Sequence, residues 1–213
     1  MIQKPEIGGV LLAGGKASRM DYRDKAMQLL HGKTLLEHCI ERASPQVDRL
    51  VLSVNHSAEL YQPFGLPLVA DHDASYRGPL LGIYSAMHWF VHEQTEHKLK
   101  YLACFAADVP AFPADLIGNL ARALSSNRSA GRVAYTVHSG QVQPLFSLWD
   151  LKLLDTISAA IDSGLYGPKL LFESLDAIAV NDASTAPGAF FNINSADELK
   201  TATQLLSKNR PRT

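Results

Sequence analysis

The residues best suited to chemistry lie near the N-terminus, in the stretch VLLAGGKASRMDYRDKA at residues 10–26. An apolar run ends there at Gly14 and Gly15, and four cations, Arg19 and Lys25 among them, follow within ten residues. Glycines let a ligand approach the backbone, whose N–H groups bind phosphate oxygens. The alternative is a tight turn followed by a solvated charged loop. With an apolar strand before it and this spacing of cations after it, the stretch predicts a loop that binds a polyphosphate.

Two aspartates follow other apolar runs and could complete such a site. Asp108 comes directly after YLACFAA, residues 101–107, and Asp71 follows a short strand candidate at residues 67–70. Mg²⁺ prefers oxygen ligands and commonly links one or two carboxylates to phosphate. Either aspartate alone would more simply be a helix cap or a turn residue. Together with the glycine and lysine loop they predict a nucleotide–Mg²⁺ site, with Asp108 as the metal ligand.

Several other chemistries fit the sequence less well. The loop lacks the third glycine of a dinucleotide fingerprint, and the GKT at residues 32–34 lacks the glycine that a P-loop places five positions earlier. His88 and His92 stand four apart on a predicted helix without a glutamate base, which indicates a helix face and not a zinc site. No G-x-S-x-G elbow is present.

The composition fits one domain that binds a small ligand. The chain has 213 residues with 46% hydrophobic residues, enough for one core over residues 1–206, and we expect the polar tail at 207–213 to fray. The net charge of -1 argues against a nucleic-acid partner. No apolar run approaches the roughly 20 residues of a membrane helix, and no signal peptide is evident, so we expect a cytoplasmic protein. Cys39 and Cys104 lie in apolar runs and are expected to be buried thiols.

Short apolar runs alternate with segments of helical periodicity along the chain. Strands are expected at residues 7–13, 49–54, 67–70, 101–107, 131–137, 143–149, 176–180 and 189–193, and helices at 34–43, 79–94, 113–125, 150–163 and 195–206. This order predicts an α/β sandwich with a mostly parallel central sheet. Ligands bind beyond the carboxyl ends of parallel strands, which is where the glycine loop and both aspartates would lie.

Six sequence blocks occur in an order typical of a known family. They are LAGGKASRM with DKAM (12–27), HGKTLLEH (31–38), GPLLGI (78–83), ADVPAFP (107–113), QPLFSLW (143–149) and FFNINSADEL (190–199). Together they span nearly the whole chain and resemble the molybdenum cofactor guanylyltransferases, the MobA family of the nucleotidyltransferase superfamily. The resemblance implies a Rossmann-like three-layer α/β fold and a single nucleotidyltransferase domain. It also implies transfer of GMP from GTP to the terminal phosphate of Mo-molybdopterin with Mg²⁺, giving the guanine dinucleotide cofactor and pyrophosphate.

The resemblance also assigns roles to individual residues. The expected nucleotide-binding residues are Leu12, Ala13, Gly14, Gly15, Lys25, Asn55, Asp71 and Asp108. Asp108 matches the Mg²⁺ ligand, and we expect Lys25 and Arg19 to stabilise the charge that leaves on pyrophosphate. Asn192 and Asn194 match the block that completes the pterin side. The partners implied are GTP, Mo-molybdopterin, proteins that load molybdopterin and the molybdoenzymes that accept the product.

One position departs from the family pattern and keeps alternatives open. Members usually have glycine after Arg-Met, whereas this chain has Asp21, whose carboxylate would repel a triphosphate unless it points away or Arg23 offsets it. The alternatives are a cytidylyl or sugar-phosphate nucleotidyltransferase, and a GTP-binding regulatory or carrier protein without turnover. The ADVPAFP and FFNIN blocks favour the guanylyl function, because the cytidylyltransferases usually have Asp-Gln-Pro at the metal aspartate and lack FNIN.

Overall fold

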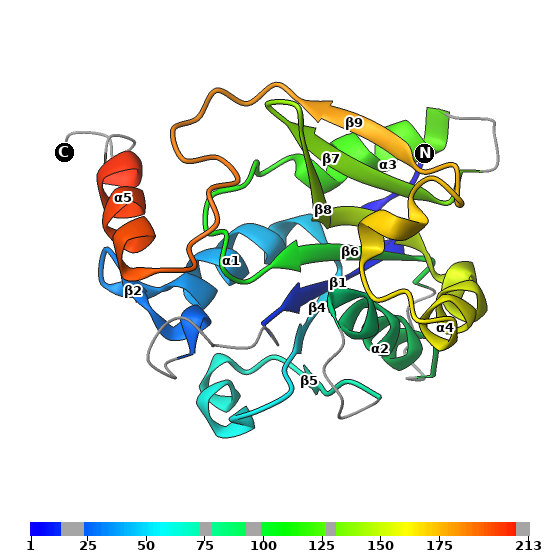
Figure 1. The fold of residues 1–213 in the computed structure, drawn as a ribbon, viewed down its shortest axis with the longest axis horizontal. Helices are drawn as coiled ribbons and strands as arrows, with labels where there is room; N and C mark the ends of the chain where they lie inside the picture. The colour runs from blue at the N-terminus through cyan, green and yellow to red at the C-terminus, as the bar shows by residue number, and fades with distance from the viewer. Residues whose placement is uncertain (14–23, 73–77, 93–98, 127–130, 208–213) are drawn as a thin grey trace.

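A seven-stranded sheet forms the centre of the molecule (Figure 1). The computed structural model describes residues 1–13, 24–72, 78–92, 99–126 and 131–207. Its sheet consists of β1 (Ile7–Leu12), β4 (Arg49–Ser53), β5 (Leu68–Val69), β6 (Tyr101–Ala106), β7 (Val133–His138), β8 (Gln141–Asp150) and β9 (Ile178–Asp182). The strand order is β5-β4-β1-β6-β8-β7-β9, in which β8 pairs antiparallel with both neighbours and the other pairings are parallel. The predicted α/β fold with a mostly parallel sheet is confirmed.

Helices cover both faces of this sheet. The α-helices are α1 (Leu35–Ala43), α2 (Pro79–His92), α3 (Leu116–Ser126), α4 (Leu154–Asp162) and α5 (Ala196–Ser207). Short 3-10 helices are η1 (Lys4–Glu6), η2 (Lys25–Met27), η3 (Ser44–Gln46), η4 (Ala58–Leu60), η5 (Gln62–Phe64), η6 (Leu151–Leu153) and η7 (Pro168–Leu171), and β2 (Leu29–Leu30) pairs with β3 (Lys33–Thr34) in a separate hairpin. Because side chains alternate along a strand, Leu11 and Phe105 pack with α1 and α3, whereas Val10 and Cys104 pack with α2 and α4. Within the residues described, the helices are too short or too polar to cross a membrane.

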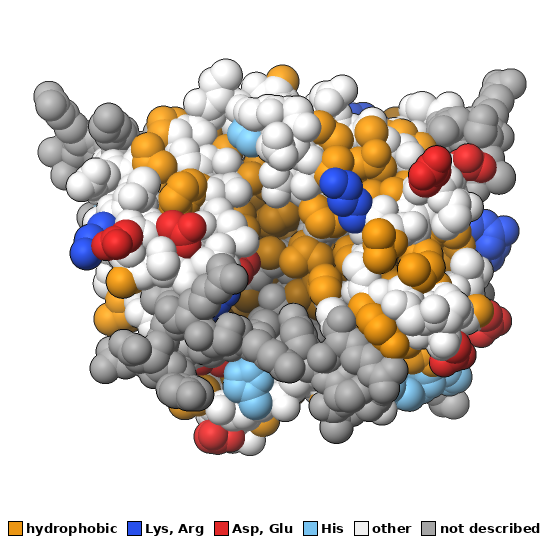
Figure 2. Space-filling view, in the orientation of Figure 1, with side chains coloured by type: hydrophobic (Ala, Val, Ile, Leu, Met, Phe, Trp, Pro, Cys, Tyr) orange, Lys and Arg blue, Asp and Glu red, His pale blue; other side chains and the backbone are white. Residues whose placement is uncertain are grey.

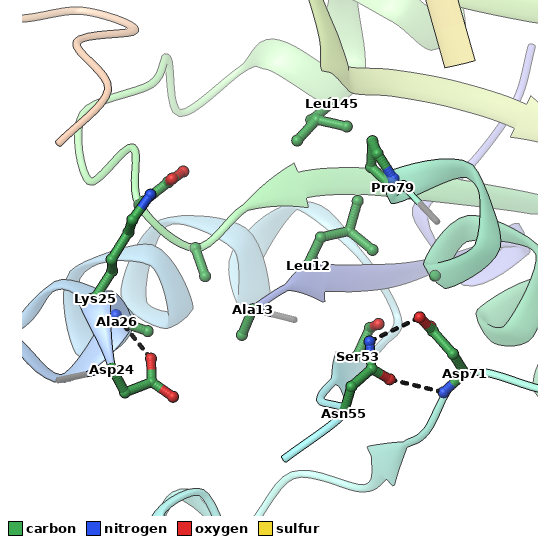
Figure 3. A pocket seen from close by; sticks show the side chains of 14 residues that line it. Leu12, Ala13, Asp24, Lys25, Ala26, Ser53, Asn55, Asp71, Pro79 and Leu145 are labelled. Carbon is green, nitrogen blue, oxygen red and sulfur yellow. Dashed lines mark hydrogen bonds between the residues drawn. The ribbon is translucent and has the colours of Figure 1, made fainter. Parts of the chain in front are cut away.

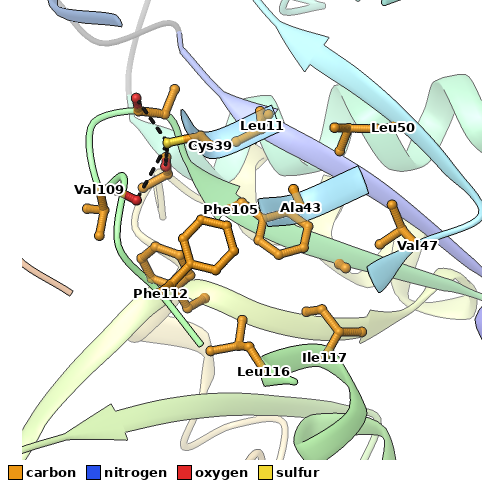
Figure 4. Close-up of a cluster of buried hydrophobic side chains, with 14 of the residues drawn as sticks. Leu11, Cys39, Ala43, Val47, Leu50, Phe105, Val109, Phe112, Leu116 and Ile117 are labelled. Carbon is orange, nitrogen blue, oxygen red and sulfur yellow. Dashed lines mark hydrogen bonds between the residues drawn. The ribbon is translucent and has the colours of Figure 1, made fainter. Parts of the chain in front are cut away.

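The core beneath the carboxyl end of β6 is tightly filled (Figure 4). Cys39 of α1 is buried there, and its thiol donates towards the carbonyl oxygens of Ala107 and Val109, each 3.5 Å away. Burial raises the pKa of the Cys39 and Cys104 thiols, so both stay protonated and the prediction of buried thiols is confirmed. The loop that carries Asp108 therefore rests on a packed layer.

The strand predicted at residues 189–193 is wrong. Phe190 has a φ of 57°, in the left-handed region, which an extended strand does not use. Its N–H donates to the carbonyl oxygen of Ala111 at 2.8 Å, and the N–H of Ile193 donates to that of Asp108 at 3.0 Å. The FFNIN segment, residues 190–194, therefore bonds to the loop after β6 and lies outside the sheet.

Candidate active site

A cavity of about 340 Å³ opens at the carboxyl ends of β1, β4 and β6. Its lining residues are Leu12, Ala13, Asp24, Lys25, Ala26, Ser53, Asn55, Asp71, Gly78, Pro79, Gly82, Ala107, Asp108 and Leu145. These three strands are parallel, so the loops that follow them meet at one edge of the sheet, where α/β folds bind ligands. Figure 2 shows this face of the molecule hollowed at its centre, with hydrophobic side chains at the bottom of the hollow.

The structure brings together most of the predicted site residues that it describes. Those that line the cavity are Leu12, Ala13, Lys25, Asn55, Asp71 and Asp108. Those that lie outside the described residues are Gly14, Gly15, Arg19 and Asp21. Asn194 contacts the cavity residue Lys25 through its side chain, whereas Asn192 is exposed and does not line the cavity.

One end of the cavity carries a reciprocal pair of polar side chains (Figure 3). The side-chain amide of Asn55 donates to Asp71 Oδ2 at 2.7 Å, and the backbone N–H of Asp71 donates to Asn55 Oδ1 at 2.9 Å. Asn55 follows β4 and Asp71 follows β5, which pair in parallel, so the sheet places the two residues side by side. The two hydrogen bonds fix the orientation of a carboxylate at the edge of the cavity.

The middle of the cavity is apolar and narrow. Leu12, Pro79 and Leu145 contribute hydrophobic surface to it (Figure 3). Gly82 of α2 adds no side chain, and a Cβ there would lie 2.9 Å from both Leu12 Cδ2 and Ser53 Oγ. The glycine therefore lets α2 approach β1 and β4 closely, and the resulting apolar wall suits a flat aromatic ring.

Lys25 lies at the opposite end of the cavity, on the short helix η2. Asp24 caps this helix: its Oδ1 accepts from the N–H of Ala26 at 3.1 Å, and its Oδ2 accepts from the Tyr61 hydroxyl at 2.5 Å. The Tyr61 side chain is completely buried, and burial, followed by the neighbouring carboxylate, raises its pKa, so the phenol remains a donor. The Lys25 ammonium donates to Asn194 Oδ1 at 2.8 Å. The cation is thus held from both its backbone and its tip.

Asp108 provides a partly buried carboxylate beside this cation. Burial raises the pKa of the Asp108 carboxyl, the Lys25 ammonium counteracts this, and the Glu198 carboxylate raises it further. An ionised group with such surroundings gains by binding a cation. Among the described residues, groups of three or more His, Cys, Asp or Glu side chains that could hold a metal ion are absent. The donor set fits Mg²⁺, which usually takes one or two carboxylates and completes its shell with phosphate and water.

Sequence reasoning left several lining residues without a role. They are Asp24, Ala26, Ser53, Gly78, Pro79, Gly82, Ala107 and Leu145. All except Ser53 lie within the blocks DKAM, GPLLGI, ADVPAFP and QPLFSLW, so their place in these blocks was the sequence signal that could have indicated them as site residues. Tyr61 lies outside every block, and no pattern in the sequence connects it with Asp24.

Comparisons with known proteins identify the family. Residues 9–178 match the MobA-like NTP transferase domain. A molybdenum cofactor guanylyltransferase of Burkholderia ambifaria is 37% identical over 202 residues, covering 92% of this chain and 94% of the relative. One of Cupriavidus pinatubonensis is 33% identical over 208 residues, covering 94% and 98%.

A solved structure shows the same fold. The molybdopterin-guanine dinucleotide biosynthesis protein A of Archaeoglobus fulgidus superposes with a TM-score of 0.75 at 22% identity, over 94% of this chain and 99% of that one. With the domain match and the curated relatives covering most of the sequence, the chain belongs to the MobA-like NTP transferase family, among the molybdenum cofactor guanylyltransferases.

Proposed function

We propose that this chain transfers GMP from GTP to the terminal phosphate of Mo-molybdopterin, with release of pyrophosphate. One observation carries the proposal: a single cavity has the Asn55–Asp71 pair at one end and Lys25 beside Asp108 at the other. The first end suits a nucleobase and the second suits phosphates. The names of the curated relatives supply the acceptor, because they are molybdenum cofactor guanylyltransferases.

The base end favours guanine on chemical grounds. Guanine presents two adjacent N–H donors on its Watson–Crick edge, and a carboxylate accepts two such donors side by side. Asp71 supplies this carboxylate, oriented by Asn55, and Leu12 supplies the apolar wall against which the ring lies. Cytosine offers a single amino donor next to an acceptor nitrogen, which would face the carboxylate unfavourably.

The phosphate end neutralises charge. Lys25 donates to the phosphates, and we expect the backbone of Gly14 and Gly15 and the side chain of Arg19 to add further donors. Asp108 would hold Mg²⁺, which when bound supplies positive charge to the triphosphate. These groups together stabilise the charge that leaves on pyrophosphate.

The reaction needs no general base from the protein. The attacking group is a phosphate monoester whose second pKa is about 6, so it is already ionised near neutral pH. The work of the chain is to align the two phosphates and to offset their repulsion. This agrees with the described lining residues, which include no histidine or cysteine.

The test is pyrophosphate release from GTP, Mg²⁺ and molybdenum-loaded molybdopterin. We expect turnover by the wild type and a loss of roughly 10²-fold or more in kcat for Asp108→Asn, the scale of other electrostatic catalytic groups. Asp155→Asn, which removes an exposed carboxylate from α4, is the matched control and should retain full activity. An unchanged rate in Asp108→Asn would contradict the proposed metal site.

The same assay separates the alternatives. Preference for CTP over GTP in binding and turnover would indicate a cytidylyltransferase. Tight GTP binding without pyrophosphate release, in the presence of molybdenum-loaded molybdopterin, would indicate a carrier or regulatory protein. The Asn55–Asp71 pair favours GTP over CTP.

A further inference from the structure

The FFNIN segment, residues 190–194, joins two parts of the molecule that are far apart in sequence. Ile193 is fully buried in a cluster with Leu30, Leu35 and Ala202. Its backbone N–H donates to the carbonyl oxygen of Asp108 at 3.0 Å. The segment is therefore fixed between the hairpin that follows Lys25 and the loop that carries the proposed metal ligand.

Asn194 is held by the first turn of α5. Its backbone N–H donates to Glu198 Oε2 at 2.6 Å, and the backbone N–H of Glu198 donates to Ser195 Oγ at 3.2 Å. Ser195 thus accepts from the third residue of α5, and the side chain of that residue reaches back to the residue before Ser195, so the start of the helix sets the direction in which the chain enters it. The position of Asn194 is thus set by the helix and not by Lys25.

The side chain of Asn194 then holds the tip of Lys25. Asn194 Oδ1 accepts from Lys25 Nζ at 2.8 Å across 169 residues of sequence. A lysine side chain carries about 2 kcal/mol of rotamer entropy, so a fixed acceptor reduces what must be lost when phosphate binds. The ammonium has three donors, and one bond to Asn194 leaves two for phosphate oxygens.

The hydrogen-bond acceptor at the tip of Lys25 is a neutral amide oxygen, which matters for a cation that is proposed to bind phosphate. A carboxylate at this position would form an ion pair with Lys25 and compete with the triphosphate for its charge. An amide oxygen orients the ammonium without cancelling that charge.

We propose that Asn194 is a positioning residue that aims Lys25 at the GTP phosphates, so that the C-terminal segment controls the binding of GTP. The proposal rests on the proposed function, in which Lys25 contacts the triphosphate. It differs from the role that the family resemblance assigns to Asn194, which is on the pterin side. An experiment without molybdopterin distinguishes the two roles.

The experiment measures GTP affinity by calorimetry with Mg²⁺ and no molybdopterin. We expect Asn194→Ala to weaken GTP binding about three- to tenfold, and Asn194→Asp, which keeps the shape and adds a charge, to weaken it more than tenfold. Asn181→Asp adds the same charge on the exposed face of β9 and should leave GTP affinity unchanged. Wild-type affinity in both Asn194 variants would overturn the proposal.

A double-mutant cycle identifies the route of the effect. In a Lys25→Met background, Asn194→Ala should change GTP affinity by less than twofold, because the ammonium group on which Asn194 acts is absent. An undiminished effect in that background would show that Asn194 acts elsewhere and would overturn the proposal. In turnover, Asn194→Ala should raise the KM for GTP and lower kcat while the KM for the acceptor stays within twofold.

These outcomes are distinguishable from failure of the proposed function. A wild-type protein that neither binds GTP nor releases pyrophosphate would remove the function itself. A wild-type protein that turns over normally, with Asn194 variants that match it in GTP affinity, would remove only the positioning role.

Discussion

Tyr61→Phe tests whether a buried hydrogen bond behind the cavity holds Lys25 in place. The Tyr61 ring is completely buried, and its hydroxyl donates to Asp24 Oδ2 at 2.5 Å. Asp24 in turn caps the short helix that presents Lys25. Removing one oxygen atom deprives a carboxylate of a donor and leaves the packing of the ring otherwise unchanged.

The size of the effect follows from the surroundings of that carboxylate. A hydrogen bond to a charged group contributes about 1.5–3 kcal/mol. His56 Nε2 lies 3.7 Å from the same oxygen, but its side chain is 44% exposed, so it replaces only part of the lost bond. We therefore expect Tyr61→Phe to lower the free energy of unfolding by about 2 kcal/mol, which corresponds to roughly 4–8 °C in Tm for a chain of this length. A looser Asp24 should also lower kcat/KM for GTP by about tenfold, equivalent to about 1.4 kcal/mol.

Urea unfolding and GTP kinetics on the same preparations provide the measurement. Tyr101→Phe, at the other end of strand β6 from the cavity, is the matched control and should behave as wild type in both. If Tyr61→Phe unfolds within about 0.5 kcal/mol of wild type and keeps its kcat/KM, the hydroxyl neither stabilises Asp24 nor positions Lys25.

Three further changes test other parts of the site and its surroundings. Gly82→Ala places a methyl group 2.9 Å from Leu12 Cδ2. The overpacking cost of about 1–3 kcal/mol should exceed the helix-propensity gain of about 1 kcal/mol. Thermal unfolding should therefore show a lower Tm, and calorimetry should show weaker GTP binding. Asp71→Asn should raise the KM for GTP about tenfold or more and reduce the preference for GTP over CTP, measured by competition. Burial and then the neighbouring imidazoles lower the pKa of His88, so the folded state binds a proton at His88 less tightly than the unfolded chain does. The folded state should therefore lose stability as the pH falls from about 6.5 through the lowered pKa. His88→Gln should reduce this loss, measured by urea unfolding at neutral and acid pH.

Local patterns predicted most elements because each one carried its own signal. Helical periodicity placed α1, α2 and α5 within a few residues of their observed bounds. The strand predicted at 189–193 failed because apolar content alone suggested it. The partners of that segment are carbonyl oxygens of the loop after β6, which no local pattern reveals.

The residues of the site fall into the same two groups: those that a local sequence pattern predicts and those that only the tertiary arrangement brings together. Asp71 and Asp108 could be predicted because each one follows an apolar run that forms a strand of the parallel sheet. The bond between Lys25 and Asn194 joins residues 169 positions apart, and the bond between Asp24 and Tyr61 depends on how η4 and η5 fold. Such pairs follow from the tertiary arrangement, so the sequence identified the residues that line the cavity better than the residues that position them.

The charges around the cavity support the proposal that a metal ion binds with GTP. Three of its described lining residues are aspartates and one is a lysine, an unfavourable balance for a triphosphate ligand. Asp24 is satisfied by Ala26 and Tyr61, and Asp71 is held by Asn55. Asp108 remains a carboxylate whose pKa is raised by burial and by Glu198, with Lys25 as the opposing charge. A divalent cation at Asp108 would offset the net negative charge of these four side chains where the phosphates are proposed to lie, so GTP and Mg²⁺ should each bind more tightly in the presence of the other.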